Sequence, residues 1–148
     1  MSQMRNGVAE MTRFRVSEAA AILGVSDDTL RRWADAGRLD LRRGENGRSY
    51  VEGAQLAPLA QELAAESALA TAFPAARTSA RNRITGIVTK VTKDGVMAQV
   101  ELQAGPFRIV SLMSREAADE LGLEPGSLAV ASVKATTVVV ELPDHKEN

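Results

Sequence analysis

The first half of the chain carries apolar residues at the spacing of an amphipathic helix. The residues at i, i+3, i+4 and i+7 of its first stretch are Val16, Ala19, Ala20 and Leu23. This spacing predicts a helix that Ser17 caps and Gly24 ends. Ser26 then caps a second helix. A connection as short as residues 24–26 predicts a steep crossing of the two helices, as in a helix-turn-helix.

A hairpin and a third helix are predicted after the two crossing helices. Residues 39–43 and 48–51 flank Asn46-Gly47, a dipeptide typical of tight hairpin turns, so this hairpin would form a wing. Residues 53–63 carry leucines at helical spacing, although Pro58 must then lie in the first turn of that helix. We therefore expect residues 1–65 to form a winged helix-turn-helix domain that is mostly α.

The second half alternates apolar and polar residues with the period of strands. Strands are predicted at residues 83–91, 96–102, 107–112, 128–134 and 137–142. Ser114 caps a short helix at 115–121, between the third and fourth strands. This order predicts a five-stranded barrel of the oligonucleotide/oligosaccharide-binding (OB) type over residues 78–142. The fold class is then α+β with two domains, joined by a linker at 66–77 and followed by a charged tail at 143–148.

Composition excludes several kinds of chemistry. The chain has 148 residues, of which 45% are hydrophobic and 25% charged, the balance of a soluble globular protein. It has no cysteine, which excludes disulfides, thiolate metal sites and cysteine nucleophiles. Its one histidine, His145, lies in the charged tail and is expected to be solvated. Because the sequence shows no nucleophile–base pair and no paired carboxylates in a recognisable frame, we expect no enzymatic activity.

The hydrophobic pattern also indicates where in the cell the protein is expected. The longest apolar stretch is far shorter than the roughly 20 residues of a membrane helix, and no apolar signal-peptide core follows the first Met. We therefore expect a cytoplasmic protein with no membrane partner.

Positive charge gathers around the second helix and the hairpin. Between Arg31 and Arg48 six arginines face three acidic residues, a local charge of about +3, whereas the whole chain has a net charge of −1. Arginines in the first turns of a helix can contact guanine edges and phosphates in the major groove of double-stranded DNA. The alternative is a solvated polar face, because the domain as a whole is not basic.

Residues 13–63 resemble the DNA-binding domain of the MerR and excisionase families. The resemblance lies in residues 14–20 at the start of the first helix, 24–33 in the turn and second helix, and 42–50 in the wing. It implies that Thr29 and Arg31 face bases, and that Arg42, Arg48 and Tyr50 contact phosphates. The DNA-contacting set is completed by Arg32 and Arg43. The long dimerising coiled coil of MerR proteins is missing, so pairing of DNA half-sites would depend on the other domain.

Two polar clusters in the second half suggest an anion site. One is Ser79-Ala80-Arg81-Asn82 before the first strand, and the other is Lys134-Ala135-Thr136-Thr137 between the last two. Together they offer two fixed positive charges and several hydroxyl and backbone N–H donors, which suit a tetrahedral dianion. The alternative is that they are an ordinary linker end and an ordinary strand connection.

The clusters also resemble those of the Mop (molybdenum-pterin-binding, or molbindin) domain, a domain of the TOBE type. The matching segments include Gly86-Ile87-Val88 and residues 121–126, in the expected order over residues 78–142. The resemblance implies molybdate, or tungstate, bound at subunit interfaces. The implied oxyanion-binding residues are Ser79, Ala80, Arg81, Lys134, Ala135 and Thr136 on one side and Ser114 on the other. Thr136 stands where serine is usual, and capping of the short helix explains Ser114 equally well.

Taken together, the two halves predict a molybdate-responsive, DNA-binding transcriptional regulator that forms a homo-oligomer, a dimer or a hexamer, through the Mop domain. One alternative is a cytoplasmic molybdate storage or buffering protein with an accessory helix-turn-helix. Another is an architectural DNA-binding protein whose barrel only oligomerises. The arginine set of the first half discriminates against storage, because buffering of an anion does not require it.

Overall fold

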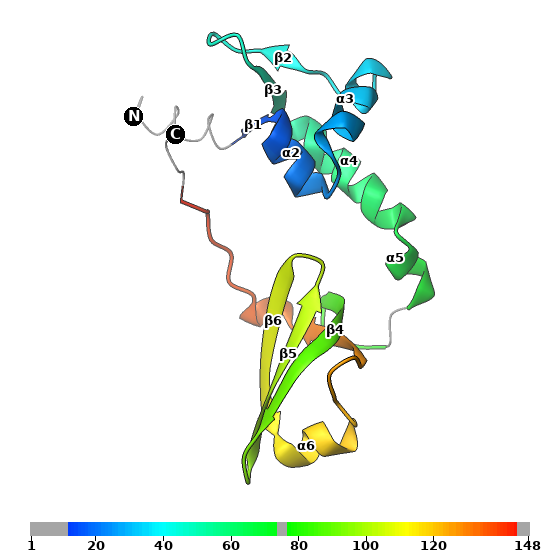
Figure 1. Ribbon diagram of the computed structural model, residues 1–148, viewed down its shortest axis with the longest axis vertical. Coiled ribbons are helices and arrows are strands. Elements are labelled where there is room, and N and C mark those ends of the chain that lie inside the picture. The colour runs from blue at the N-terminus through cyan, green and yellow to red at the C-terminus, as the bar shows by residue number, and fades with distance from the viewer. Residues whose placement is uncertain (1–11, 74–76, 145–148) are drawn as a thin grey trace. The chain divides into compact units, whose positions relative to one another are not determined.

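The computed structural model describes residues 12–73 and 77–144 (Figure 1). The chain divides between Pro74 and Ala75 into two compact units, of which the second ends at Leu142. His145, the rest of the predicted tail from 146 to 148, residues 1–11 of the predicted first domain and residues 74–76 of the predicted linker lie outside the described residues. The two units are described separately below.

The first unit is a set of helices beside a small antiparallel sheet. Its helices are α2 (Val16–Leu23), α3 (Asp27–Asp35), α4 (Gly53–Glu66) and α5 (Ala68–Ala72). Its strands are β1 (Arg13–Arg15), β2 (Arg42–Arg43) and β3 (Ser49–Glu52), in the order β1-β3-β2. Part of the range predicted as a linker is therefore helical. None of the helices among the described residues is long and apolar enough to cross a membrane.

Local sequence explains where α2 and α3 begin and end. Gly24 adopts a left-handed conformation (φ 71°) that ends α2, and the Ser26 hydroxyl accepts a hydrogen bond from Thr29 N–H at 3.1 Å to cap α3. The prediction that Ser17 caps α2 is wrong. The cap is Arg15, whose backbone N–H donates to the Glu18 carboxylate at 3.1 Å, so the helix begins two residues earlier than a Ser17 cap requires.

Tertiary packing supports α4 in spite of its proline. Pro58 lies inside the helix, five residues after its first residue Gly53, and not in the first turn, so the predicted place of the proline is wrong. It has no N–H to donate to the carbonyl four residues earlier. Leu56 and Leu59, on either side of it, are buried in the same core as Leu30 of α3 and Val51 of β3. This burial offsets the lost hydrogen bond.

The second unit is a four-stranded antiparallel sheet with one short helix. Its elements are β4 (Asn82–Lys93), β5 (Met97–Ala104), β6 (Phe107–Ser114), α6 (Arg115–Glu120), β7 (Leu128–Val133) and a 3₁₀ turn, η1 (Ala135–Thr137). The strands lie in the order β6-β5-β4-β7. The inner face of the sheet forms a small core around Val88, Val100 and Leu102.

Strand β4 is bent over this core. Its pairing with β5 shifts register between Val88 and Lys90, an irregularity that increases the local bend and twist of a strand. Gly86 permits a close approach at the same region, because a Cβ there would lie 2.8 Å from the backbone oxygen of Gln103. The long strand can therefore pair with β5 along one part and with β7 along another.

The expectation of a five-stranded barrel is not met within one chain. The segment predicted as the fifth strand begins with the 3₁₀ turn, and residues 138–144 belong to no helix or strand. Figure 1 shows this orange-to-red segment leaving the sheet instead of lying along it. Its β-branched residues favour an extended backbone, but a strand also requires a neighbouring edge to pair with. The described residues contain the extended segment without that pairing.

Candidate functional site

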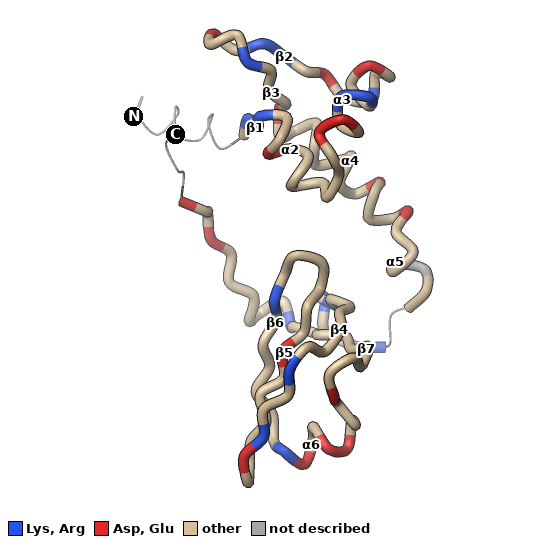
Figure 2. Tube along the Cα trace, in the orientation of Figure 1, with Lys and Arg blue, Asp and Glu red and all other residues tan. Residues whose placement is uncertain are grey.

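The arginines predicted to contact DNA lie on the surface of the first unit. All five, Arg31, Arg32, Arg42, Arg43 and Arg48, are exposed. Within residues 12–73 and 77–144 none of the five forms an ion pair with an acidic side chain. Figure 2 shows the basic positions on β1, on β2 and on α3. Their guanidinium groups are therefore available for phosphates or base edges.

Two surface grooves bring residues of α3, the β2–β3 hairpin and β1 together. The first, of about 340 Å³, is lined by Arg31 of α3, Arg48 of the hairpin and Arg15 of β1. The second, of about 510 Å³, shares Arg15 and Arg48 and adds Arg13 and Tyr50. Acidic side chains also line the grooves, Asp27 in the first and Glu18 and Glu45 in the second, and Arg13 and Arg15 form ion pairs with Glu52 and Glu18. The grooves thus bring arginines of α3, the hairpin and β1 together on a surface of mixed charge.

Thr29 and Tyr50 are held by neighbours within this surface. The Thr29 hydroxyl oxygen accepts hydrogen bonds from the Ser26 hydroxyl at 2.9 Å and from the Arg32 guanidinium at 3.2 Å. Its own hydrogen remains to be donated. The Arg13 guanidinium lies 4.7 Å from the centre of the Tyr50 ring, a cation–π contact that fixes the ring beside the groove.

Sequence reasoning missed Arg13 and Arg15 as candidate DNA contacts. They precede the first helix, where the pattern showed no element. In the structure β1 pairs with β3, so that Arg13 lies opposite Glu52 and Arg15 opposite Tyr50. Only this pairing places the two arginines beside the hairpin, and three residues are too short for a strand pattern to reveal it.

Arg38 differs from the other arginines of this region. Its guanidinium lies 4.8 Å from the centre of the Trp33 ring and 3.4 Å from a carboxylate oxygen of Glu62. It thereby connects the end of α3 with α4. We assign it to the packing of the unit and not to the candidate DNA surface.

In the second unit, the pairing of β4 with β7 brings the two polar clusters together. Asn82 begins β4 and lies opposite Val133, the last residue of β7. The Asn82 side-chain amide also donates a hydrogen bond to the Val133 carbonyl at 3.1 Å. Because Ser79-Ala80-Arg81 leads into one of these strands and Lys134-Ala135-Thr136 follows the other, both clusters lie at the same end of the pair.

The second of these clusters is a tight turn with polar groups on its surface. The Lys134 carbonyl accepts hydrogen bonds from the backbone N–H and the hydroxyl of Thr137, both at 3.0 Å. Lys134, Thr136 and Arg81 are exposed, and among the described residues neither Lys134 nor Arg81 has an acidic partner. The arrangement offers two cations and a threonine hydroxyl to an anion.

Ser114 lies at the opposite end of the sheet from these clusters. It pairs with Met97, and the neighbouring pair on β5 and β4 is Ala98 with Lys93, the last residue of β4. Strand β4 is 12 residues long, which at about 3.3 Å per residue is on the order of 35 Å from end to end. One chain therefore does not bring Ser114 to Arg81 and Lys134.

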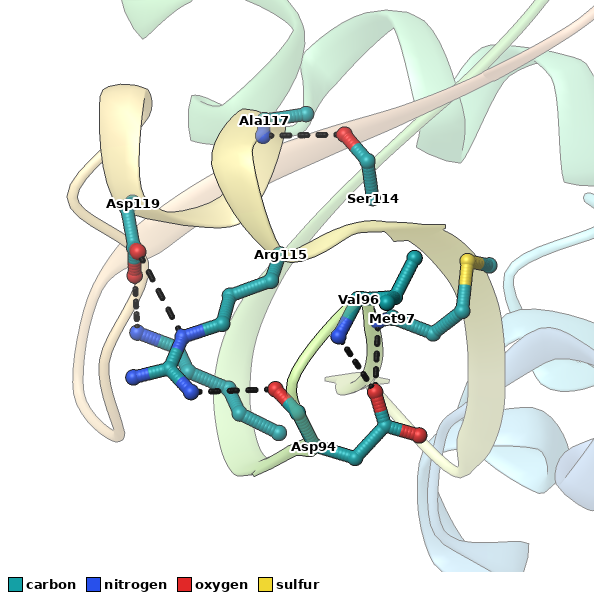
Figure 3. Close-up of polar contacts among 8 residues, drawn as sticks. Asp94, Val96, Met97, Ser114, Arg115, Ala117 and Asp119 are labelled. Atoms are coloured by element: carbon teal, nitrogen blue, oxygen red, sulfur yellow. Dashed lines mark hydrogen bonds and ion pairs between the residues drawn. The ribbon is translucent and has the colours of Figure 1, made fainter.

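The Ser114 hydroxyl also has a structural role. It accepts a hydrogen bond from Ala117 N–H at 3.1 Å and so caps α6 (Figure 3). Capping uses an oxygen lone pair and leaves the hydroxyl hydrogen to be donated. The two explanations that the sequence left open, a helix cap and an anion ligand, are therefore chemically compatible, and the structure shows the cap.

A polar brace holds the beginning of α6 against the β4–β5 turn (Figure 3). Arg115 donates to the Asp94 carbonyl at 3.0 Å, and the Asp94 carboxylate accepts from Val96 and Met97 N–H at 2.8 and 2.7 Å. These two backbone donors lower the pKa of Asp94. The pKa of Asp119 is lowered chiefly by its hydrogen bond with the Lys93 ammonium. The brace orients the turn that carries Ser114.

The described residues contain no group of three or more His, Asp or Glu side chains that could hold a metal ion.

Comparison with known proteins matches both units. Residues 78–140 match the TOBE domain and residues 15–50 the MerR family regulatory protein. The chain is 40% identical over 63 residues to molybdenum-pterin-binding protein 2 of Clostridium pasteurianum, a match that covers 42% of this chain and 93% of that protein.

Longer relatives match over the same share of this chain. It is 40% identical over 68 residues to the molybdenum-pterin-binding protein MopA of Rhodobacter capsulatus and 38% identical over 65 residues to the molybdenum transport protein ModE of Herbaspirillum seropedicae. These matches cover 45% and 43% of this chain but only 26% of MopA and 24% of ModE.

A solved structure matches as well. The cytoplasmic molybdate-binding protein ModG, with molybdate bound, is 40% identical, with a TM-score of 0.44 over 46% of this chain and 49% of ModG. Through its second unit, this chain belongs to the family of TOBE-domain molybdenum-pterin-binding proteins, and residues 15–50 of its first unit match the MerR family regulatory protein.

Proposed function

We propose that this protein is a molybdate-responsive, DNA-binding transcriptional regulator. The observation that carries the proposal is the pairing of β4 with β7, which assembles Arg81 and Lys134 in a chain that also carries exposed arginines on a MerR-family region. The relatives named for molybdenum, among them ModE, support the anion. Arg81 and Lys134 would bind the anion that is sensed, and the exposed arginines would bind the DNA.

The winged helix-turn-helix interpretation assigns the DNA contacts. Helix α3 would enter the major groove with Thr29, Arg31 and Arg32, while Arg42, Arg43, Arg48 and Tyr50 of the hairpin contact the flanking backbone. The shared groove of Arg15, Arg31 and Arg48 supports this assignment, because it places arginines of the helix and of the hairpin side by side. Arg13 and Arg15 extend the surface and join the proposed phosphate contacts.

The anion is proposed to be molybdate, with tungstate as a chemically similar ligand. A tetrahedral dianion suits two cationic side chains together with backbone N–H and hydroxyl donors. These donors come from Ser79, Ala80, Arg81, Lys134, Ala135 and Thr136. Charge-assisted hydrogen bonds of this kind contribute about 1.5 to 3 kcal/mol each.

Ser114 can join this site only in an oligomer. It lies at the other end of the sheet in its own chain, so a site that contains Ser114 together with Arg81 and Lys134 requires two copies. We therefore propose a homo-oligomer, a dimer or a hexamer, formed through the second unit. An anion at the interface would change subunit geometry, and with it the spacing of paired α3 helices, which must match a DNA turn of about 34 Å.

Calorimetric titration with sodium molybdate is the primary test. Wild-type protein is expected to bind the anion, and both Arg81→Ala and Lys134→Ala are expected to weaken binding at least tenfold, since each removes about 1.5 to 3 kcal/mol. Lys90→Ala is a matched control, an exposed lysine on β4 outside the clusters. Unchanged affinity in both cluster variants would contradict the site.

A DNA-binding assay on the same samples tests the output. Fluorescence anisotropy with a labelled duplex, with and without molybdate, is expected to show duplex binding at low salt and a change in affinity when the anion is present. Failure to bind any duplex in either condition would favour a cytoplasmic molybdate storage protein. That second candidate is supported by the Clostridium relative, 93% of whose length matches the second unit alone.

A further inference from the structure

In the turn that follows β7, hydrogen-bond acceptors are occupied and several donors are free. The carbonyl oxygens of Val133, Lys134 and Ala135 each accept a hydrogen bond. The backbone N–H groups of residues 134–136 have no acceptor among the described residues, and the first N–H of the turn that donates is that of Thr137. A stretch of backbone with engaged carbonyls and free N–H groups suits a negatively charged ligand.

Two of these three carbonyls are engaged by side chains. The Asn82 amide donates to the Val133 carbonyl at 3.1 Å, and the Thr137 hydroxyl donates to the Lys134 carbonyl at 3.0 Å. These carbonyls belong to the two peptide groups that flank Lys134. The C=O and N–H of a trans peptide group point in opposite directions, so a fixed carbonyl also fixes its N–H. The two side chains thereby set the directions of the Lys134 and Ala135 N–H groups.

Asn82 also connects the two halves of the anion cluster, by which we mean residues 79–81 and 134–136. Asn82 directly follows Arg81, and Val133 directly precedes Lys134. The hydrogen bond joins residues 51 positions apart and is partly buried, whereas Arg81 and Lys134 are exposed. It supplements the pairing of Asn82 with Val133 at the ends of β4 and β7. The backbones that carry the two cations are therefore held together one residue away from each of them.

The two threonines of the turn differ in what their hydroxyls can donate. Thr137 gives its single hydroxyl hydrogen to the Lys134 carbonyl and has none left for an anion. Thr136 is exposed, and its hydroxyl has no partner among the described residues. Thr136 can therefore be a ligand, while the contact of Thr137 is with the backbone of the turn.

We propose that Asn82 and Thr137 are positioning residues of the anion site, which fix the backbone on either side of Lys134 without contacting the anion. The inference rests on the proposed function and adds two residues that determine its affinity. Donors that are already oriented lose less conformational entropy when the ligand binds. A free Lys134 carbonyl could also turn its negative end toward the anion. Removal of either side chain would thus weaken binding although every ligand group remains.

Thr137 is tested with two substitutions that differ in the hydroxyl. The full chain is titrated with sodium molybdate by calorimetry, at a temperature at which circular dichroism shows each variant to be folded. Thr137→Val, which has a similar shape but no hydroxyl, is expected to weaken binding about two- to tenfold, the effect of one hydrogen bond. Thr137→Ser keeps the hydroxyl and is expected to bind molybdate as wild type does.

Thr89 supplies a matched control in the same sheet. Its hydroxyl donates to the Glu101 carbonyl at 3.2 Å, between β4 and β5 and outside the anion cluster. Thr89→Val removes the same kind of hydrogen bond and is expected to leave the affinity for molybdate unchanged. Wild-type affinity in Thr137→Val, or equal weakening in Thr137→Val and Thr89→Val, would overturn the role of Thr137.

Asn82 is tested by selectivity as well as affinity. Asn82→Ala is expected to weaken molybdate binding about two- to tenfold. Donors that are no longer held can adapt to the smaller sulfate ion, so the ratio of molybdate to sulfate affinity, measured by competition, is expected to fall. Gln103→Ala is the control, because the Gln103 amide donates to the Gly105 carbonyl at 2.9 Å, outside the cluster. A lower thermal stability of Asn82→Ala with unchanged affinity and ratio would show that Asn82 only stabilises the sheet.

The outcomes separate this inference from the proposed function. If wild type binds molybdate and Arg81→Ala weakens binding, but Asn82→Ala and Thr137→Val bind as wild type does, the positioning role is wrong and the anion site stands. If wild type binds no molybdate, the proposed function is wrong and the positioning role is wrong with it.

Discussion

Two hydroxyl side chains in this protein accept hydrogen bonds near the beginning of a helix and still keep a hydrogen to donate. Ser114 caps α6 through its oxygen, which leaves its hydrogen to be donated, and Thr29 accepts two hydrogen bonds in the first turn of α3 while retaining a donor. The arginines, in contrast, differ in their contacts according to where they lie. Arg38 is held by Trp33 and Glu62, whereas Arg31 and Arg42 are exposed without an acidic partner in the described chain.

This division predicts different effects for two arginine substitutions. Arg31→Ala, on the face of α3, is expected to relax base preference by about 1 to 3 kcal/mol at one position of the operator. Arg42→Ala, in the hairpin, is expected to weaken binding to all duplexes about equally and to lower the slope of log affinity against log salt by about one. Competition binding with a set of single-base operator variants at several salt concentrations measures both quantities.

Arg77→Ala provides the control for this pair, because Arg77 is exposed and lies outside the DNA-contacting set. It is expected to leave base preference and the salt slope unchanged. The assignment of α3 to the major groove would be wrong if Arg31→Ala changed the salt slope but not the preference among bases.

At the scale of elements, strand pairing assembles both the anion cluster and the arginine surface. The pairing of β4 with β7 unites two clusters about 50 residues apart in sequence, and the pairing of β1 with β3 places two arginines beside the hairpin of the proposed DNA surface. Helix α6 is positioned differently, by the polar brace of Lys93, Asp94, Arg115 and Asp119. This brace joins the turn after β4 to the helix that Ser114 caps.

The brace predicts a stability that depends on pH. The folded-state pKa values of Asp94 and Asp119 are lower than the ordinary aspartic acid value of about 3.9. The stabilisation by the ionised carboxylates is therefore fully present above that value and is lost as the pH falls through the folded-state pKa values. Thermal unfolding of the wild type and of Asp119→Asn, followed by circular dichroism from pH 7 to pH 2, is expected to show a difference at pH 7 that narrows below about pH 4.

Glu116→Gln is the matched control, since Glu116 lies on the same helix and has no ion pair among the described residues. It is expected to show no such narrowing. A difference between wild type and Asp119→Asn that persists unchanged at pH 2 would show that ionisation of the Asp119 carboxylate is not what stabilises the brace.

At the scale of the whole molecule, the two units have separate cores and the proposed function requires them to communicate. The first core gathers around Leu30 and Val51, and the second around Val88 and Val100. Small aliphatic cores of this size leave a modest margin of stability, which ligands and partner subunits can increase. Binding of an anion between subunits should therefore be visible as stabilisation.

Molybdate is expected to stabilise the assembly by about 2.7 kcal/mol at a concentration 100 times its dissociation constant. Denaturant unfolding of the second unit, with and without the anion, measures this directly, with Lys134→Ala as the variant in which the effect should vanish. Sulfate at equal ionic strength controls for general salt effects. Equal stabilisation of wild type and Lys134→Ala would show that molybdate does not stabilise the protein by binding at the cluster that contains Lys134.

The sequence by itself was sufficient for the features that depend on nearby residues. The two crossing helices, the Ser26 and Ser114 caps and the turn at Asn46-Gly47 follow from hydrogen bonds and backbone preferences within a few positions. The resemblance to the MerR and Mop families rests on such local segments, and the family comparisons confirm it. Where a neighbouring residue competed, as Arg15 did with Ser17 for the cap of α2, the local pattern was off by a residue or two.

Tertiary structure decided what depends on distant partners. That Asn82 lies beside Val133, that Arg13 and Arg15 lie beside the hairpin, and that Ser114 lies far from Arg81 all follow from strand register, which is a property of paired strands and not of either strand alone. The same reason explains why the predicted fifth strand is not found among the described residues. Residues 138–142 have the composition of a strand, but a strand exists only against an edge, and residues 138–144 belong to no helix or strand in the described chain.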